Sequence, residues 1–202
     1  KADVLSSLGL SPKEKDKNNP LVSMVTRLYE QKGMDLVVQI IPELVQRNCF
    51  IAILGSGDPY IQQRLEKLRD KYPNNIALYL GFNNQLAHKL YAGSDLFLMP
   101  SLFEPCGLSQ MMALRYGSVP IVRETGGLND SVVPFNEYEN TGTGFSFANY
   151  NAHEMLDTID YALHVYYDMK DKWHDLVVRG MQENLDWDHS SEQYIRVFSS
   201  LL

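Results

Sequence analysis

Short apolar runs alternate along the chain with longer stretches in which apolar residues recur every three or four positions. Brief apolar runs bounded by glycine, proline or polar residues are typical of buried strands, and the longer period is typical of helices. This pattern predicts strands at residues 21–26, 49–54, 76–80, 96–99 and 119–122. It predicts helices at residues 36–47, 61–71, 86–91, 108–116, 152–169, 173–183 and 190–202.

Strands that alternate with helices over short links indicate a parallel sheet, because each parallel strand needs a crossover before the next. We therefore predict an α/β fold with helices on both faces of the sheet and a helical tail at the carboxyl end. The segment before the first strand, residues 11–20, is polar and rich in lysine, and Pro20 precedes the first apolar run. This segment is predicted to lead into the sheet domain.

Composition narrows the classes of function. A chain of 202 residues with 45% hydrophobic residues can bury the core of one α/β domain. Its net charge of −7 provides no broad positive surface for nucleic acid or for an anionic membrane. Neither a spanning apolar run nor a signal-peptide pattern is evident, and a start at Lys1 suggests an excised fragment. Cys49 and Cys106 match no metal or disulfide spacing, which favours a reducing compartment.

Ligands of open parallel sheets bind outside the carboxyl ends of the strands, so the loops after the strands carry the candidate chemistry. Arg27 and Lys32 follow the first strand. Together they could clamp a diphosphate, with forked hydrogen bonds from Arg27 and a point charge from Lys32. A solvated charged loop is the alternative, and this segment alone favours that alternative.

The second and third loops give weaker signals. Gly55 and Gly57 begin a dinucleotide-binding pattern that fails at Tyr60, where a third glycine belongs, so a tight turn that admits a ligand to the backbone is the better interpretation. Gly81 and Phe82 follow the third strand and offer a flat aromatic face suited to an adenine ring. Taken alone, a phenylalanine such as Phe82 more often belongs to the core.

The fourth loop, residues 100–110, leads from a buried strand straight into a helix and is the most specific. Gly107 and its neighbours would leave helix-start amides free to face a phosphate. Glu104 could bind sugar hydroxyls or stabilise positive charge on an anomeric carbon, although a lone glutamate is also a common surface residue or cap. Cys106 near the helix start could be reactive, but a small packed thiol is the commoner case.

The fifth loop contains Thr125, Gly126 and Gly127 at the same edge of the sheet, where they could line a sugar or phosphate pocket. The five histidines form no metal-binding pair, and His88 is interpreted as structural.

Taken together, these motifs resemble those of bacterial glycogen synthases and plant starch synthases over nearly the whole chain. Glu-Pro-Cys-Gly-Leu together with its flanking blocks looks particular to that family, whereas Glu-x-x-Gly after a strand recurs across glycosyltransferases with two Rossmann-like domains. The motifs in chain order are Arg27-x4-Lys32-Gly33, Gly81-Phe82, His88-x2-Tyr91-Ala92-Gly93-x-Asp95, Pro100-Ser101-x-Phe103-Glu104-Pro105-Cys106-Gly107-Leu108 and Thr125-Gly126-Gly127-Leu128.

The resemblance implies the carboxyl-terminal Rossmann-like domain of a two-domain GT-B enzyme of glycosyltransferase family 5. Such an enzyme transfers glucose from ADP-glucose to the non-reducing end of an α-1,4-glucan, with retention. Carried over by position, Glu104, Arg27 and Lys32 are the expected catalytic residues, the two cations holding the diphosphate and Glu104 contacting the donor glucose. The expected donor-binding residues are Gly81, Phe82 (stacked on adenine), Cys106, Gly107, Leu108, Ser109, Thr125, Gly126 and Gly127.

The resemblance also implies how the chain is divided and what it works with. Residues 1–20 are expected to be an interdomain linker, 21–185 the nucleotide-sugar-binding domain, and 186–202 a helix that crosses to an amino-terminal domain. That domain carries a Lys-x-Gly-Gly loop and much of the acceptor groove, and no such loop occurs here. We therefore expect the isolated chain to be inactive.

The expected partners are ADP-glucose or ADP, the glucan, glycogen or starch, and the missing domain, with no cofactor, metal, nucleic acid or membrane. The expected location is the cytoplasm of a bacterium, or the plastid if the source is a plant. Two alternatives stay open. One is a related GT-B transferase that uses a UDP- or GDP-sugar, and the other is a non-catalytic nucleotide- or glucan-binding module.

Overall fold

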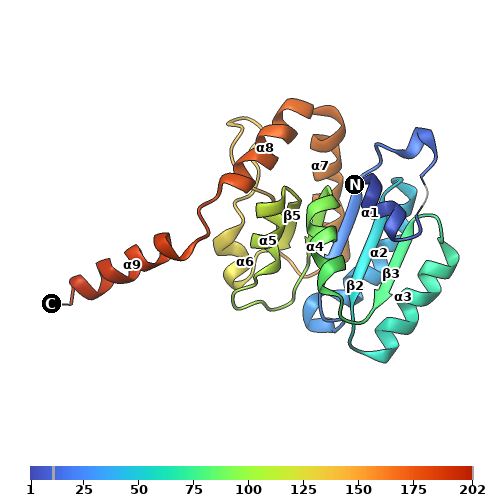
Figure 1. Ribbon diagram of the computed structural model, residues 1–202, viewed down its shortest axis with the longest axis horizontal. Helices are drawn as coiled ribbons and strands as arrows, with labels where there is room; N and C mark the ends of the chain where they lie inside the picture. The colour runs from blue at the N-terminus through green and yellow to red at the C-terminus, as the bar shows by residue number, and fades with distance from the viewer. Residues whose placement is uncertain (11, 202) are drawn as a thin grey trace.

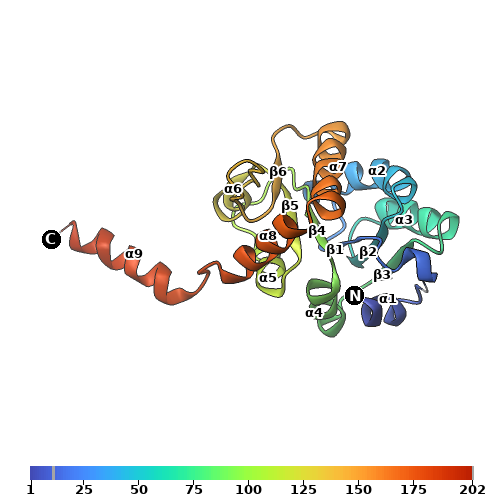
Figure 2. The same ribbon diagram turned by 90° about the horizontal axis from the view of Figure 1, so that it is seen from above.

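Six parallel strands form a single sheet in the order β3-β2-β1-β4-β5-β6 (Figure 1, Figure 2). The computed structural model describes residues 1–10 and 12–201; Ser11 and Leu202, which fall in the predicted linker and terminal helix, lie outside the described residues. The chain builds outward from β1 to β3 and then returns to place β4 beside β1, so the winding reverses between β1 and β4. The strands are β1 (Leu21–Val25), β2 (Phe50–Gly55), β3 (Ile76–Leu80), β4 (Leu96–Met99), β5 (Val119–Arg123) and β6 (Phe145–Phe147).

Helices cover both faces of this sheet (Figure 2), which confirms the predicted fold class. One face carries α2 (Met34–Gln46), α3 (Pro59–Lys71) and α7 (Ala152–Asp168). The other carries α1 (Ala2–Ser7), α4 (Asn84–Gly93) and α5 (Ser109–Tyr116). Helix α8 (Lys170–Gln182) packs against α5 and α7, and α6 (Gly126–Ser131) follows β5.

The sheet has a hydrophobic core on each face, because successive side chains of a strand point to opposite faces. Along β4, Leu96 and Leu98 enter the core beneath α2 and α7, whereas Phe97 enters the core beneath α4. These side chains are buried on both faces, as a central parallel strand requires. The continuous apolar run that predicted this strand therefore reflects burial on both sides.

Two short α-helices, α1 and α6, and the short strand β6 were not predicted. Strand β6 has three residues, too few to show a period of two, and α6 starts with Gly126 and Gly127, which are poor helix formers. In α1, Val4 and Leu5 are buried in the core beneath α4, so part of the predicted linker packs on the sheet domain. The domain boundaries at residues 20 and 185 stay a prediction.

Helix α9 (Trp187–Ser199) extends away from the other helices (Figure 1). Its large apolar side chains are exposed, among them Trp187, Ile195 and Phe198. The idea that α9 crosses to another domain stays a prediction. Within the described part of the chain, no helix combines the length and apolar character needed to cross a bilayer.

Candidate active site

Two adjoining cavities lie at the carboxyl ends of the central strands. The smaller, about 80 Å³, lies between the ends of β1 and β4 and is lined by Lys32, Glu104 and the start of α5. The larger, about 260 Å³, lies at the ends of β1, β2 and β3 and is lined by Arg27 and Phe82. Both cavities are lined by Val25 and Thr26, so they form one trough along the edge where the winding reverses.

Lys32 and Glu104 form a largely buried ion pair in the smaller cavity. The Lys32 ammonium donates to Glu104 Oε2, and the Ser101 hydroxyl donates to the same oxygen at 3.3 Å. Only 7% of Glu104 is exposed. A buried carboxylate needs such partners, because desolvating an unpaired charge costs several kcal/mol. The sequence placed both residues at this edge but did not predict their contact.

Gly33 brings the two halves of this pair together. It follows the 3-10 turn Glu30–Lys32 with φ 73°, in the left-handed region that favours glycine. A Cβ atom on Gly33 would lie 2.1 Å from the Pro100 carbonyl oxygen. The Lys32 turn therefore rests directly on the backbone that leads into the Glu104 loop.

The start of α5 lies beside the ion pair. Gly107 has φ 73°, and no side chain caps the helix at Leu108 or Ser109. The first amides of a helix have no intrahelical acceptor, so an uncapped start can bind an anion. Buried Gln110 holds the preceding turn, because its Nε2 donates to the carbonyls of Cys106 at 3.2 Å and Gly107 at 3.0 Å. This role of Gln110 was not predicted.

Gly126 and Gly127 pack against the backbone of the Glu104 loop. The Gly127 amide donates to the carbonyls of Glu104 at 3.2 Å and Pro105 at 3.1 Å. A Cβ atom on Gly126 would lie 2.2 Å from the Glu104 carbonyl oxygen, and one on Gly127 would lie 2.2 Å from that of Cys106. Both glycines are thus required for packing of backbone on backbone. Their contact with a donor, and that of the neighbouring Thr125, stays a prediction.

Phe82 and Arg27 face solvent at the larger cavity. Phe82 is 90% exposed, so the interpretation of it as a core residue is wrong and its ring is open to stacking. It follows Gly81, which has φ 144°. Arg27 is exposed and forms neither a hydrogen bond nor an ion pair through its side chain with any described residue. His88 contacts the Tyr116 hydroxyl at 3.1 Å, in keeping with a structural role.

The two thiols differ in accessibility. Cys106 is exposed, so the packed-thiol interpretation is wrong, whereas Cys49 is buried and its burial raises the pKa of its thiol to about 12. Because the thiolate is the reactive form, we expect iodoacetamide at neutral pH to modify Cys106 and to leave Cys49 intact in the folded chain. Peptide mass mapping of a time course measures this, with Cys106→Ser as the control. Labelling of Cys49 at the Cys106 rate before unfolding would contradict the structure.

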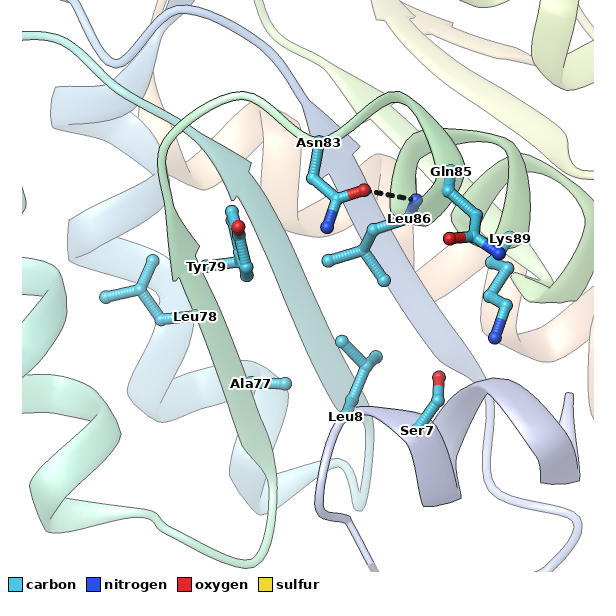
Figure 3. Close-up of a pocket in the computed structure, with 9 residues that line it drawn as sticks. All are labelled: Ser7, Leu8, Ala77, Leu78, Tyr79, Asn83, Gln85, Leu86 and Lys89. Atoms are coloured by element: carbon cyan, nitrogen blue, oxygen red, sulfur yellow. Dashed lines mark hydrogen bonds between the residues drawn. The ribbon is translucent and has the colours of Figure 1, made fainter.

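A third cavity, about 310 Å³, lies between α1, β3 and α4 (Figure 3), and neither Lys32 nor Glu104 lines it. Asn83 lines both this cavity and the larger one, and its Oδ1 accepts from the Leu86 amide at 2.9 Å, which caps α4. Among the described residues, none of the predicted site residues lines this third cavity. The lining residues are Ser7, Leu8, Ala77, Leu78, Tyr79, Asn83, Gln85, Leu86 and Lys89.

Comparison with known proteins gives a consistent match. The family model described as glycosyl transferases group 1 matches residues 10–175. The chain is 51% identical to a glycogen synthase of Clostridium botulinum (strain Eklund 17B / Type B), over 100% of this chain and 41% of the relative. It is 50% identical to a glycogen synthase of Bacillus cereus (strain B4264), over 96% of this chain and 40% of the relative. The chain thus spans about two fifths of the length of the curated relatives it matches.

Solved structures also match over nearly the whole of this chain. The catalytic domain of starch synthase IV from Arabidopsis thaliana, bound to ADP and acarbose, aligns with a TM-score of 0.89 and 36% identity, over 98% of this chain and 41% of that chain. A sucrose-phosphate synthase from Thermosynechococcus elongatus aligns with a TM-score of 0.70 and 20% identity, over 100% of this chain and 49% of that chain. The second match bears on the fold alone.

Proposed function

Because the chain belongs to the glycosyl transferases group 1 family, we propose that it is the donor-nucleotide half of a glycogen or starch synthase. The reaction proposed is retaining transfer of glucose from ADP-glucose to the non-reducing end of an α-1,4-glucan. The observation that carries the proposal is the Lys32–Glu104 pair beside the uncapped start of α5, next to the cavity lined by Phe82. The glycogen synthase relatives and the ADP-bound starch synthase support it.

In this proposal each cavity binds a different part of the donor. Adenine stacks on Phe82 in the larger cavity, and the diphosphate passes Thr26 toward the start of α5. Arg27, which has no partner among the described residues, supplies forked hydrogen bonds to the phosphates. The glucose lies against Glu104 in the smaller cavity.

The chemistry rests on the charge that develops as the diphosphate leaves. Arg27, Lys32 and the helix-start amides of α5 stabilise the negative charge on the departing phosphate, so the proposal requires no metal ligand. The Glu104 carboxylate stabilises the positive charge on the anomeric carbon. It is buried and paired with Lys32, and we assign it no nucleophilic role. Retention then follows from same-face transfer, in which the acceptor oxygen bonds to the anomeric carbon and the departing phosphate takes its proton.

The proposal also requires a second domain. The chain covers about two fifths of the length of its glycogen synthase relatives. We propose that the acceptor groove lies in the region of those relatives that this chain does not match. The exposed apolar side chains of α9 suit packing against that part. We infer weak donor binding and no efficient transfer by this chain alone. Two free cysteines favour a reducing location, and we propose the bacterial cytoplasm.

Calorimetric titration of this chain with ADP, and separately with UDP, tests the donor assignment. We expect selective ADP binding, and we expect the double variant Arg27→Ala, Lys32→Ala to weaken it at least about tenfold, because charged hydrogen bonds contribute about 1.5–3 kcal/mol each. The matched control is Lys67→Ala, Lys71→Ala, which removes two exposed cations from α3. An equal response to UDP would favour a UDP-sugar transferase instead.

A further inference from the structure

Arg123 is the last residue of β5 and lies beside the Glu104 loop. In the described part of the chain, its side chain donates hydrogen bonds to backbone carbonyls and not to a carboxylate. Its guanidinium donates from Nε to the Ser101 carbonyl at 2.8 Å, from Nη1 to the Ala148 carbonyl at 3.2 Å, and from Nη2 to the Leu102 carbonyl. Within the described ranges it forms no ion pair with a carboxylate, and it lines neither cavity of the trough. Its positive charge is therefore used to hold chain segments together.

Two of the three carbonyls that Arg123 holds, those of Ser101 and Leu102, belong to the segment just before Glu104. The Ser101 hydroxyl donates to Glu104 Oε2 at 3.3 Å, so the backbone position of Ser101 affects the carboxylate directly. The next residue is tied to the other half of the ion pair, because the Leu102 amide donates to the Gln31 carbonyl at 2.9 Å. Gln31 lies in the turn that ends at Lys32.

Arg123 reaches the same turn a second way, through Tyr150. Its guanidinium carbon lies 6.0 Å from the centre of the Tyr150 ring, within the range of a cation–π contact. The single hydroxyl hydrogen of Tyr150 is shared between two acceptors, the Asp35 carboxylate and, at 3.1 Å, the Glu30 carbonyl oxygen. Burial and the hydrogen bond to Asp35 raise the pKa of Tyr150, so the hydroxyl keeps its proton at neutral pH. Arg123 and Tyr150 together join the Glu104 loop to the Lys32 turn.

We propose that Arg123 is a positioning residue for the Lys32–Glu104 pair, with Tyr150 as its support. It sets the distance and orientation of the pair without contacting the donor. This inference rests on the proposed function, because it assigns Arg123 an effect on a reaction at Glu104. No sequence pattern indicates this role, since a charged residue at the end of a strand is usually a solvated side chain.

The geometry explains why the residue is an arginine. Three carbonyls from two segments are reached by three different nitrogens of one rigid fork. A lysine ammonium carries the same charge but is a single point on a flexible stem and cannot span these acceptors. Arg123→Lys therefore removes the positioning and keeps the charge.

The test is steady-state kinetics of the full-length protein that contains this chain. We expect Arg123→Lys to lower kcat about tenfold or more with a KM for ADP-glucose changed less than about threefold, because small misplacements of reacting groups cost rate far more than binding. In a Glu104→Gln background the same change should lower kcat by less than about twofold, since the effect acts through Glu104. The matched control is Arg115→Lys, an exposed arginine on α5 that donates to the Met181 carbonyl, which should leave kcat unchanged.

Full additivity of the two changes, or an unchanged kcat for Arg123→Lys, would overturn the inference. If Arg123→Lys fails to fold, Tyr150→Phe replaces it, because it removes the hydroxyl contacts to Asp35 and Glu30 and leaves the ring in place. The same non-additivity with Glu104→Gln is then expected. An unchanged kcat for Glu104→Gln would contradict the proposed function. A lower kcat for Glu104→Gln, with an unchanged kcat for the Arg123 or Tyr150 variant, would contradict this inference alone.

Discussion

Glu104→Gln in the full-length protein is expected to lower kcat for glucosyl transfer about 10²–10³-fold, the range found when one preorganised charge-stabilising group is removed from an active site. Glutamine keeps the shape of the side chain and its contact with Ser101, but it has no negative charge to offer an anomeric carbon that turns positive. The KM for ADP-glucose should change little, because this interaction forms in the transition state. Initial rates at varied ADP-glucose measure both constants.

The control for this variant is Glu43→Gln. Glu43 lies on α2 and also forms an ion pair, with Arg47 at 3.1 Å, but it does not line the trough. Glu43→Gln should leave kcat unchanged. A lower kcat in Glu104→Gln then reflects the charge of Glu104 itself and not the loss of any negative charge on the protein. A non-catalytic nucleotide- or glucan-binding module gives no role to Glu104 in transfer. Unchanged kcat in Glu104→Gln would therefore favour the module over the enzyme.

The sheet and its active edge could be predicted because their signals are local. The apolar run of β4, the fourth loop and the helix that ends at Gly117 adjoin one another in the sequence, and α5 does end at Gly117 in the left-handed conformation. Winding rules for parallel sheets then bring the loops after the strands to one edge. The shared lining of the two cavities by Val25 and Thr26 follows from that topology.

The contacts that organise the site join residues far apart in the chain, and local patterns do not encode them. Lys32 and Glu104 are 72 positions apart, and which of the charges at the edge pair with each other depends on the backbone path of both loops. The glycine pattern predicts that Gly126 and Gly127 line a pocket, but it does not distinguish approach of a ligand from approach of another backbone segment, and the backbone approach appears only in the structure. Exposure of Phe82 likewise depends on how far its loop projects beyond β3.

Gly33→Ala is expected to lower the free energy of unfolding of this chain by about 2–5 kcal/mol. The left-handed conformation of Gly33, with φ 73°, costs a residue with a Cβ atom about 1–2 kcal/mol. The remaining about 1–3 kcal/mol comes from overpacking, because the new methyl group would lie 2.1 Å from the Pro100 carbonyl oxygen and 2.8 Å from both the carbonyl carbon and the ring Cγ of Pro100. Relief of this overlap must move the Lys32 turn away from the Glu104 loop, so ADP binding should weaken as well.

Urea titration followed by circular dichroism measures the change, and Gly9→Ala is the control that isolates its cause. Gly9 has φ 76°, nearly the same backbone conformation, but a Cβ atom there would have no atom of the described residues within 4 Å. It should lose only the about 1–2 kcal/mol of the left-handed conformation and should bind ADP as the unchanged chain does. Equal losses in the two variants would show that contact with Pro100 contributes nothing. The close packing of the Lys32 turn on the Glu104 loop would then not be what holds the two charges together.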